Sequence, residues 1–475
     1  MIHYAIRRHV TRIFWVSLSC LCVTLPVEAA DKSASWKAAA GSVVITPDRP
    51  LWMAGYAARN KPSAGTAQDL FAKVLVLEDG SGTQLAIVTL DLIGVPQGFR
   101  ENVVESCRER FGLSPESILL NASHTHCGPE IRVFKIRHYG GDAAREAMAI
   151  EYTKGLVENV VNLIGNTLAR LEPARLEVTH GRAGFAMNRR LPTANGVINS
   201  PYPEGPVDHE VPVLKVLGED GQLRAVLFGY ACHNTTLSFY QFCGDYAGYA
   251  QEYLEAAHPN VTCLFLMGCG GDQNPYPRRT LDLAKQHGRA LANAVETALE
   301  VRQPRSVEGP LRVALDDVVL EFQKPSEADL QKQAESGNKY QRRHGERLLA
   351  ELKENGRIQT EYAFPVQAVQ LGDDITLVAL PGEAVIDYAL RLKSELKGDT
   401  NDAPTVWVAG YSNHVFGYLP SRRVLEEGGY EGGGAMIYSA YPGPFAESVE
   451  GRVIDKVKEL VQQVRKVPKK TSAGQ

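Results

Sequence analysis

The chain has 475 residues, of which 44% are hydrophobic and 22% are charged, and its formal net charge at pH 7 is −4. These values are typical of a folded globular protein, and they exclude collagen-like, coiled-coil and largely disordered chains. The body of the chain has no run of Lys or Arg, which argues against nucleic acid as a partner. Eight cysteines in so long a chain exclude a small disulfide-stapled fold, and they are expected to be packing residues or to form one or two bridges.

Residues 1–29 have the layout of a secretory signal peptide. Three arginines precede an apolar run from Ile13 to Val27, and a cleavage site follows near Ala29. The run is short for a membrane span, and no second candidate span follows, so membrane contact is expected to be peripheral at most. We therefore expect a signal peptide at 1–29 and a mature protein at 30–475, exported to the periplasm or the medium. A retained N-terminal anchor is the alternative.

Apolar strand patterns alternate with helical patterns along the rest of the chain. The predicted strands are 74–79, 85–94, 117–123, 223–231, 261–268, 375–382 and 405–412. The predicted helices are 101–112, 143–171, 246–258, 281–302, 384–397 and 451–466. The highly charged segment 325–358 has a helical pattern and is expected to be a solvated excursion on the surface. Since no linker or repeat separates these elements, the pattern predicts one large α/β domain.

Common hydrolase and nucleotide-binding signatures are absent from the sequence. It contains neither a GxSxG elbow, nor an HExxH helix motif, nor a GxxxxGK[ST] phosphate loop. Standard serine hydrolases, zincins and nucleotidases are therefore disfavoured.

The strongest local signal is a pair of histidines, His124 and His126, in the sequence NASHTHCGP after the strand 117–123. Residues two apart in an extended segment point to the same side, and imidazole is the commonest metal ligand at neutral pH. The pair therefore indicates a metal site, with hydrogen-bonded structural histidines as the alternative.

Four further strands also end in polar side chains of the kind that bind metals or substrates. These side chains are His233, Asp272, Glu383, Asn413, His414 and Tyr418. By itself, Glu383 is better explained as an acidic residue at the start of a helix, where it complements the helix dipole. Because α/β folds place their chemistry at strand ends, the set as a whole favours one site assembled from distant segments.

Six motifs, in order along residues 38–465, resemble the neutral/alkaline non-lysosomal ceramidase family, specifically its N-terminal catalytic domain. They are SHTHCGP (123–129), NRR (188–190), ACHNT (231–235), GCGGDQNP (268–275), LPGE (380–383) and SNHVFGY (412–418). The resemblance implies a single large α/β catalytic domain with mixed sheets and flanking helices. It also implies an amidase that uses one Zn²⁺ per chain.

Carried over position by position, the resemblance implies roles for individual residues. The implied zinc ligands are His124, His233, Glu383 and Tyr418. The implied catalytic residues are His126, Arg189 and Tyr430. His126 is expected to move protons between water and the leaving amine, while Arg189 and Tyr430 are expected to hydrogen-bond the developing oxyanion.

One position departs from the family pattern. Asn274 stands where the family has the serine that serves as its proposed nucleophile, and an amide side chain cannot act in that way. Either zinc-activated water attacks directly while Asn274 orients the substrate, or the activity has changed or been lost. We also expect the chain to lack the family's C-terminal immunoglobulin-like domain, which leaves ceramide open as the substrate.

The sequence therefore predicts an exported, zinc-dependent hydrolase that cleaves an amide bond in a small-molecule or lipid-like N-acyl substrate, with no obligate protein partner. Two alternatives stay open. One is a catalytically degenerate lipid- or sugar-binding protein that keeps the fold, and the other is a metal-dependent esterase.

Overall fold

The computed structural model describes residues 36–398 and 403–466, which all lie in one compact unit, Ala34–Gln475. The predicted signal peptide lies outside the described residues, so it and the domain boundary that follows it stay predictions. Within the described residues, no helix combines the length and the apolar character that crossing a membrane requires.

The larger of two central sheets has nine strands in the described part of the chain. They are β1 (Trp36–Val44), β2 (Phe71–Glu78), β3 (Gln84–Leu90), β4 (Ile118–Ala122), β5 (Glu172–Arg182), β8 (Glu210–Gly218), β9 (Leu223–Tyr230), β10 (Thr262–Met267) and β12 (Arg305–Val307). Their spatial order is β10-β9-β8-β5-β1-β2-β3-β4, with β12 paired to β5. The sheet is mixed, because β3 with β4 and β9 with β10 are parallel pairs among antiparallel neighbours.

The second central sheet has the order β13-β14-β15-β17, and its last two strands are parallel. These strands are β13 (Leu311–Glu321), β14 (Glu361–Leu371), β15 (Ile375–Ala379) and β17 (Thr405–Ala409). Two small sheets complete the set: β6 (Ala186–Thr193) with β7 (Gly196–Tyr202) and β11 (Gln273–Pro275), and β16 (Glu383–Ala384) with β18 (Tyr418–Leu419).

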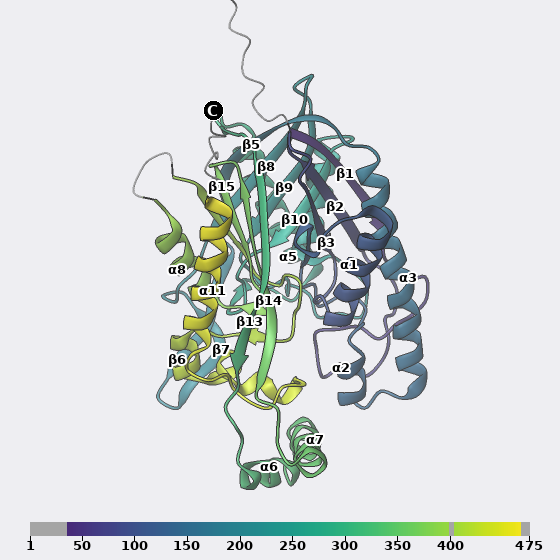
Figure 1. Ribbon diagram of the computed structural model, residues 1–475. Coiled ribbons are helices and arrows are strands. Elements are labelled where there is room, and N and C mark those ends of the chain that lie inside the picture. Colours follow the sequence, from purple (N-terminus) through teal and green to yellow (C-terminus); the bar gives the residue numbers. More distant parts are fainter. Residues whose placement is uncertain (1–35, 399–402, 467–475) are drawn as a thin grey trace, which may run out of the picture. The chain divides into compact units, whose positions relative to one another are not determined.

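Helices cover the outer faces of both central sheets (Figure 1). On the larger sheet, α1 (Gln97–Phe111) and α3 (Ala143–Leu168) lie beside β1 and β2, while α4 (Asp245–Ala257) and α5 (Leu281–Leu299) pack on β10, β5 and β8. On the smaller sheet, α11 (Val449–Arg465) packs on β13 and β14, and α8 (Ile386–Leu396) on β17. The predicted α/β class, with mixed sheets and flanking helices, is confirmed.

The other α-helices of the described residues are α2 (Val133–His138), α6 (Glu327–Ala334), α7 (Lys339–Asn355), α9 (Arg422–Glu427) and α10 (Gly429–Gly432). The ends of the longer helices follow from capping chemistry. The side chain of Asp142 accepts the Arg145 N–H at the start of α3, and α1 ends at Gly112, whose φ of 72° suits glycine.

The two central sheets pack face to face through one apolar layer. Along β2, Val74 and Val76 belong to the cluster under the helices, whereas Leu75 and Leu77 belong to the cluster between the sheets. Leu377 from the opposite sheet joins that inner cluster. A strand buried on both faces needs an unbroken apolar run, which is why this stretch was recognisable in the sequence.

The predicted elements are all present in the described residues, with small shifts at their ends. The segment 325–358 forms α6 and α7, which share a small core of Leu330, Leu348 and Ile358. The pair also contacts the body of the fold, because the hydroxyl of Tyr340 donates to the carbonyl of Ala57 at 2.7 Å. The six cysteines of the described residues are free and buried, so they serve as packing residues.

Asp91 gives the fold a pH-dependent stability. Its carboxyl is buried just beyond β3 and accepts the Phe71 N–H at 3.0 Å. Burial raises the pKa of Asp91 to about 6, above the ~3.9 of an exposed aspartate. The folded state therefore binds this proton more tightly than the unfolded state, and the free energy of unfolding falls as the pH rises from 4 through 6.

Asp91→Asn keeps an acceptor for the Phe71 N–H and removes this titration. Urea denaturation at pH 4 and pH 8 is expected to show the variant gaining about 3 kcal/mol relative to the wild type between the two pH values. Asp69→Asn, at an exposed carboxyl, is the control and should gain nothing. An equal relative stability of Asp91→Asn at both pH values contradicts this interpretation.

Candidate metal centre

Strands of both central sheets end at one place, and the polar turns that follow them meet there. Bridges between Asn121 and Ser412 and between Gly268 and Ala409 join the two sheets directly at these ends. The residues that follow β4, β9, β15 and β17 are therefore held side by side although the sequence separates them by hundreds of positions. This is the convergence expected from the sequence.

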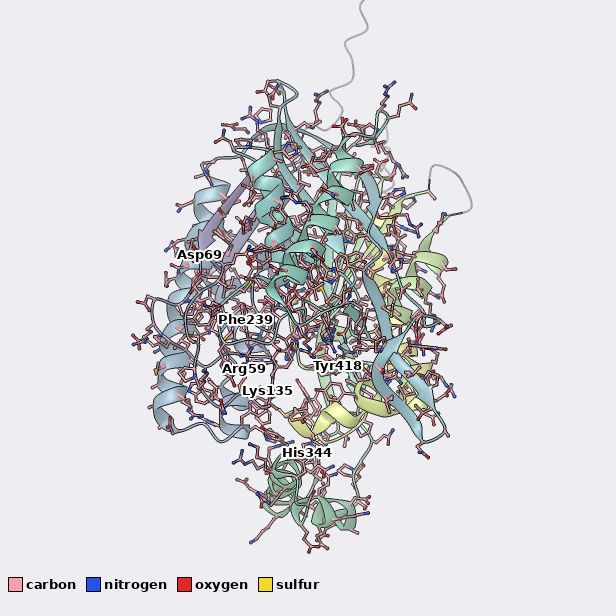
Figure 2. All side chains as sticks on the ribbon, turned by 180° about the vertical axis from the view of Figure 1, so that it is seen from behind. Arg59, Asp69, Lys135, Phe239, His344 and Tyr418 are labelled. Carbon is pink, nitrogen blue, oxygen red and sulfur yellow. The ribbon has the colours of Figure 1, made fainter. Side chains whose placement is uncertain are left out.

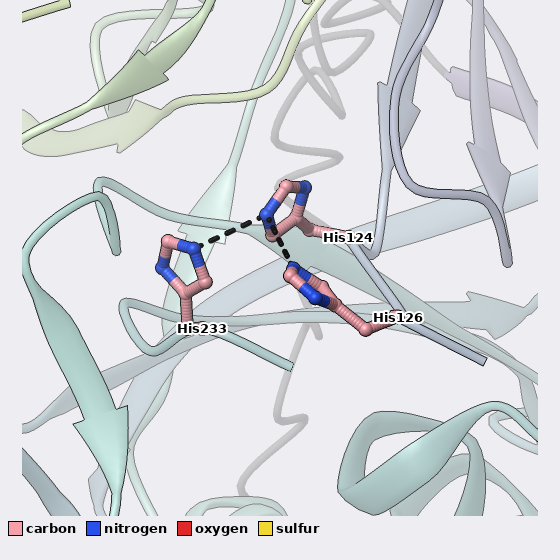
Figure 3. A group of neighbouring side chains, drawn as sticks. All are labelled: His124, His126 and His233. Carbon is pink, nitrogen blue, oxygen red and sulfur yellow. Dashed lines mark hydrogen bonds between the residues drawn. The ribbon is translucent and has the colours of Figure 1, made fainter. Parts of the chain in front are cut away.

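Three imidazoles form the centre of the site (Figure 3). The Nε2 atom of His124 lies 3.2 Å from Nε2 of His233 and 3.2 Å from Nε2 of His126. On the far side of two rings, Nδ1 of His124 donates to the carbonyl of Ile93 at 2.6 Å, and Nδ1 of His233 donates to the carbonyl of Gly270 at 2.7 Å. Since a carbonyl only accepts, both rings carry their proton on Nδ1, and both bare Nε2 atoms face the same point.

Glu383 and Tyr418 are brought to this point by a two-strand pairing. They are direct partners in the parallel pair of β16 and β18. Oε2 of Glu383 lies 3.3 Å from Nε2 of both His124 and His233, and the Tyr418 hydroxyl lies 3.4 Å from Nε2 of His233. Gly271 permits this approach, because a Cβ there would lie 2.5 Å from the carbonyl oxygen of Glu383.

The electrostatics of this group suit a bound cation. Burial, reinforced by the charge of Arg189, lowers the pKa of His233 to about 3, so its ring is neutral at pH 7. Burial acts to raise the pKa of Glu383, but His124 and His233 outweigh it and hold that pKa well below its usual range. The neutral ring of His233 and the carboxylate of Glu383 therefore share one small volume with His124.

The donor set fits a metal ion. The Oε2 atom of Glu383 is buried and has no hydrogen-bond partner in the described residues, although two histidine lone pairs face it. The ligand atoms of His124, His126 and His233 all lie within 4.8 Å of one another. Imidazole nitrogens with a carboxylate and a phenol oxygen are ligands that Zn²⁺ accepts. His124, His233, Glu383 and Tyr418 are thus placed as ligands of a metal site would be.

His126 differs from the other two histidines in how its ring is held. Its Nδ1 is buried without a hydrogen-bond partner among residues 36–398 and 403–466. Its ring packs instead against Tyr56 and Gly55, and a Cβ at Gly55 would lie 2.4 Å from the ring. Burial, with the neighbouring His124, lowers the pKa of His126 well below its usual value. The ring is therefore neutral and not fixed in one tautomer, as a proton-transfer group requires.

Arg189 lies behind Tyr418, and all three of its donor nitrogens are engaged. Nη2 donates to the Tyr418 hydroxyl at 2.8 Å, Nη1 to Oδ1 of Asn274 at 3.0 Å, and Nε to Glu431 at 2.8 Å. Glu431 also accepts from Arg190 at 2.8 Å, so one buried carboxylate holds two adjacent arginines. The guanidinium of Arg189 is therefore placed to orient Tyr418.

Asn274 is fully buried in the same network. Its Oδ1 also accepts from Thr235 at 3.2 Å, and its Nδ2 donates to the hydroxyl of Tyr276 at 3.3 Å. The residue that departs from the family pattern is therefore part of the buried hydrogen-bond network. Its amide oxygen connects Arg189 to Thr235, in the turn after β9.

His124, His233, Glu383 and Tyr418 are called the metal-type group below. A cavity of about 230 Å³ opens above it. Five of the predicted site residues line it: His124, His126, Glu383, Tyr418 and Tyr430. Tyr430 is 41% exposed, and its ring centre lies 5.4 Å from that of Tyr418. The other three predicted site residues, His233, Arg189 and Asn274, are not in the lining. Arg189 is connected to the cavity through Tyr418, and Asn274 through Arg189. The individual roles predicted for these residues stay predictions.

The sequence analysis missed other residues of the site. Glu431, which pairs with both arginines, follows Tyr430 in a Gly-rich segment that carries no motif. Two more residues line the cavity: Lys135, which lies in the six-residue helix α2, and Arg132, which lies just before it. The adjacent arginines 189 and 190 were the one available signal, since a buried pair of cations requires a carboxylate.

The comparisons with known proteins agree with this picture. Residues 41–268 match the family model described as neutral/alkaline non-lysosomal ceramidase, N-terminal. Neutral ceramidase A of Dictyostelium discoideum is 25% identical over 244 residues, which are 48% of this chain and 32% of that protein. The match thus spans about a third of the relative's length. The family-model match covers the first three of the six motifs, while Glu383 and Tyr418 lie beyond it.

Solved structures extend the likeness to nearly the whole chain. The crystal structure of neutral ceramidase from Pseudomonas aeruginosa superposes with a TM-score of 0.71 at 18% identity, over 93% of this chain and 76% of that one. A structure described as ceramidase complexed with C2 gives 0.70 at 18% identity, over 92% and 77%. At this identity the superpositions establish the fold. Family model, curated relative and fold together confirm the predicted resemblance of this chain to the neutral/alkaline non-lysosomal ceramidase family.

Proposed function

We propose that this chain is a zinc-dependent hydrolase that cleaves the amide bond of an N-acyl substrate. One observation carries the proposal: Nε2 of His124, Nε2 of His233 and the unpartnered Oε2 of Glu383 converge on one point, and His124 and Glu383 line an open cavity beside it. Export is part of the same proposal, and it is supported by the basic and apolar layout of residues 1–29.

The residues around this point would hold the ion and tune it. His124, His233, Glu383 and Tyr418 would be the ligands. When bound, the zinc would polarise the amide carbonyl and bring the pKa of a water molecule to near 7. Burial raises the pKa of Tyr418, and the positive charge of Arg189 acts against this rise. Arg189 thereby favours the ionised phenol, which is the better ligand.

The remaining cavity residues supply proton transfer and charge stabilisation. His126 is neutral and lines the cavity, so it would accept a proton from the attacking water and pass it to the leaving amine. The Tyr430 hydroxyl would donate a hydrogen bond to the developing oxyanion, a contact worth about 3 kcal/mol when well aligned. Asn274 has no hydroxyl to attack with, so water is the nucleophile in this account.

The proposal is tested by turnover on matched amides and esters, including a ceramide, with and without a chelator. Amide cleavage that a chelator abolishes and added Zn²⁺ restores is the expected result. Cleavage of the esters alone would make the chain a metal-dependent esterase. Tight lipid or sugar binding without any turnover would favour the degenerate binding protein.

Asn274→Ser separates direct attack by water from a lost serine nucleophile. The wild type is expected to be active, and the variant is expected to show kcat/KM at or below the wild-type value, by up to about tenfold. The reason is that serine cannot maintain the bond from the charged Arg189, which contributes roughly 1.5–3 kcal/mol. Activity found only in Asn274→Ser would show instead that the chain is an inactivated relative.

A further inference from the structure

The cavity above the metal-type group has two cations in its lining, and one of them has no carboxylate partner in the described part of the chain. Lys135 and Arg132 both line it, and Figure 2 shows Lys135 in the same region as Arg59 and Tyr418. The ammonium of Lys135 donates to the backbone carbonyl of Tyr438 and has no carboxylate partner in the described part of the chain.

Arg132 is paired with a carboxylate but keeps one free donor within the described part of the chain. It donates to the Glu130 carboxylate through Nε at 2.7 Å and through Nη2 at 2.6 Å. Its Nη1 has no hydrogen-bond partner among the described residues. Apart from Glu383, no lining residue of the cavity is acidic. An anion that enters the cavity would therefore meet one free ammonium and one free guanidinium N–H.

The neighbouring cavity also has cations in its lining, together with one carboxylate, that of Glu130. It measures about 260 Å³ and shares Tyr56, Ala57 and Tyr139 with the first. Arg59 and Arg145 line it, and neither has a carboxylate partner in residues 36–398 and 403–466. Arg59 instead donates to three backbone carbonyls, those of Ala54, Phe239 and His126. Arg145 stacks on a tryptophan, with its guanidinium carbon 3.5 Å from the ring centre.

The surroundings of Lys135 disfavour its charged form. Burial, together with the charge of Arg132, lowers the pKa of Lys135 to about 7, which is the cost of holding an ammonium there without a counter-ion. A bound anion would remove that cost.

We propose that the substrate of this site is an N-acyl amide that carries an anionic group, such as a carboxylate, next to the scissile bond, and that Lys135 with Arg132 binds this group. The inference rests on the proposed function, since it names the substrate class of the same site. The cavity is also smaller than the roughly 300–1,000 Å³ of pockets for drug-sized ligands, which suits a compact charged group.

The test compares two amides that differ only in charge, N-octanoylglycine and N-octanoylglycinamide. The wild type is expected to show a kcat/KM for the carboxylate at least about tenfold higher, because hydrogen bonds to charged groups contribute that much. Lys135→Met keeps the length of the side chain without its charge and should bring the ratio near one, mainly through KM for the carboxylate. Lys135→Arg should keep the preference. Lys353→Met, at an exposed lysine of α7, is the matched control and should leave the ratio unchanged.

A second pair, N-octylsuccinamic acid and its neutral diamide, has the carboxylate on the acyl side of the scissile bond. Comparing the two pairs shows on which side of that bond the site binds the anionic group. Equal kcat/KM for both members of both pairs overturns the inference and leaves the proposed function intact. A preference that persists in Lys135→Met overturns the role of Lys135. If neither amide is hydrolysed, calorimetric titration of the same compounds measures the charge preference, and equal affinities overturn the inference. The panel of amides and esters that includes a ceramide then decides the proposed function separately.

Discussion

Replacing His233 with alanine is expected to lower kcat/KM for amide hydrolysis by more than about a hundredfold. Changes in groups that merely orient a metal ligand already cost 10–100-fold, and His233 is placed as a ligand itself. Its Nε2 lies 3.2 Å from that of His124 and 3.3 Å from Glu383, so the change removes one donor from the centre of this group. Steady-state kinetics on an N-acyl amide measure the loss.

His258→Ala is the matched control for this change. His258 is partly exposed at the end of α4 and pairs with Glu296 at 2.9 Å, far along the chain from the site. Its removal should leave kcat/KM unchanged, and thermal unfolding should show that both variants are folded. A His233→Ala protein that is folded and hydrolyses the amide at the wild-type rate contradicts the assignment of the site.

Arg189→Met is expected to destabilise the protein by about 3–5 kcal/mol and to reduce activity. The change removes one of two cations from the buried carboxylate of Glu431, and it deprives the Tyr418 hydroxyl of its donor at 2.8 Å. Removing one partner of a buried ion pair leaves an under-compensated charge, which accounts for the size of the loss. Urea denaturation measures it, with Arg422→Met as the exposed control, which should leave the stability almost unchanged.

A double-mutant cycle isolates the charge effect. Adding Glu431→Gln to Arg189→Met should cost less than the sum of the two single changes, because the carboxylate that lost its partner is then neutral. Strict additivity would show that the two side chains do not interact. Activity should fall in every variant that lacks Arg189, since Tyr418 then lacks its hydrogen bond.

Strands buried on both faces were the part of the fold that the sequence predicted best. The apolar runs at 74–79 and 261–268 became β2 and β10, because strands between two apolar layers require such runs. Strands with one wet face were missed. In β13, Asp316 and Asp317 interrupt the apolar pattern on the exposed side, and in β14, Pro365 falls within the strand, where it argues against one.

The candidate site divides in the same way. The ligand-type residues stand directly after recognisable strands, so the strand ends placed them correctly beside one another. The sequence could not show which site residues line the cavity and which lie behind the lining. Arg189 was expected to reach the substrate, but it lies behind Tyr418 and contacts that residue. Lys135 lies in no recognisable motif. The proposal that it binds an anion depends on the structure, in which Lys135 lines the cavity and has no carboxylate partner among the described residues.

Zinc content is the most direct test of the account. Wild-type protein and His233→Ala, purified identically without added chelator, are compared by elemental analysis. The account predicts about one zinc ion per wild-type chain and a content near zero in the variant. Equal zinc in the two proteins, or none in the wild type, would contradict a metal centre built from His124, His233, Glu383 and Tyr418.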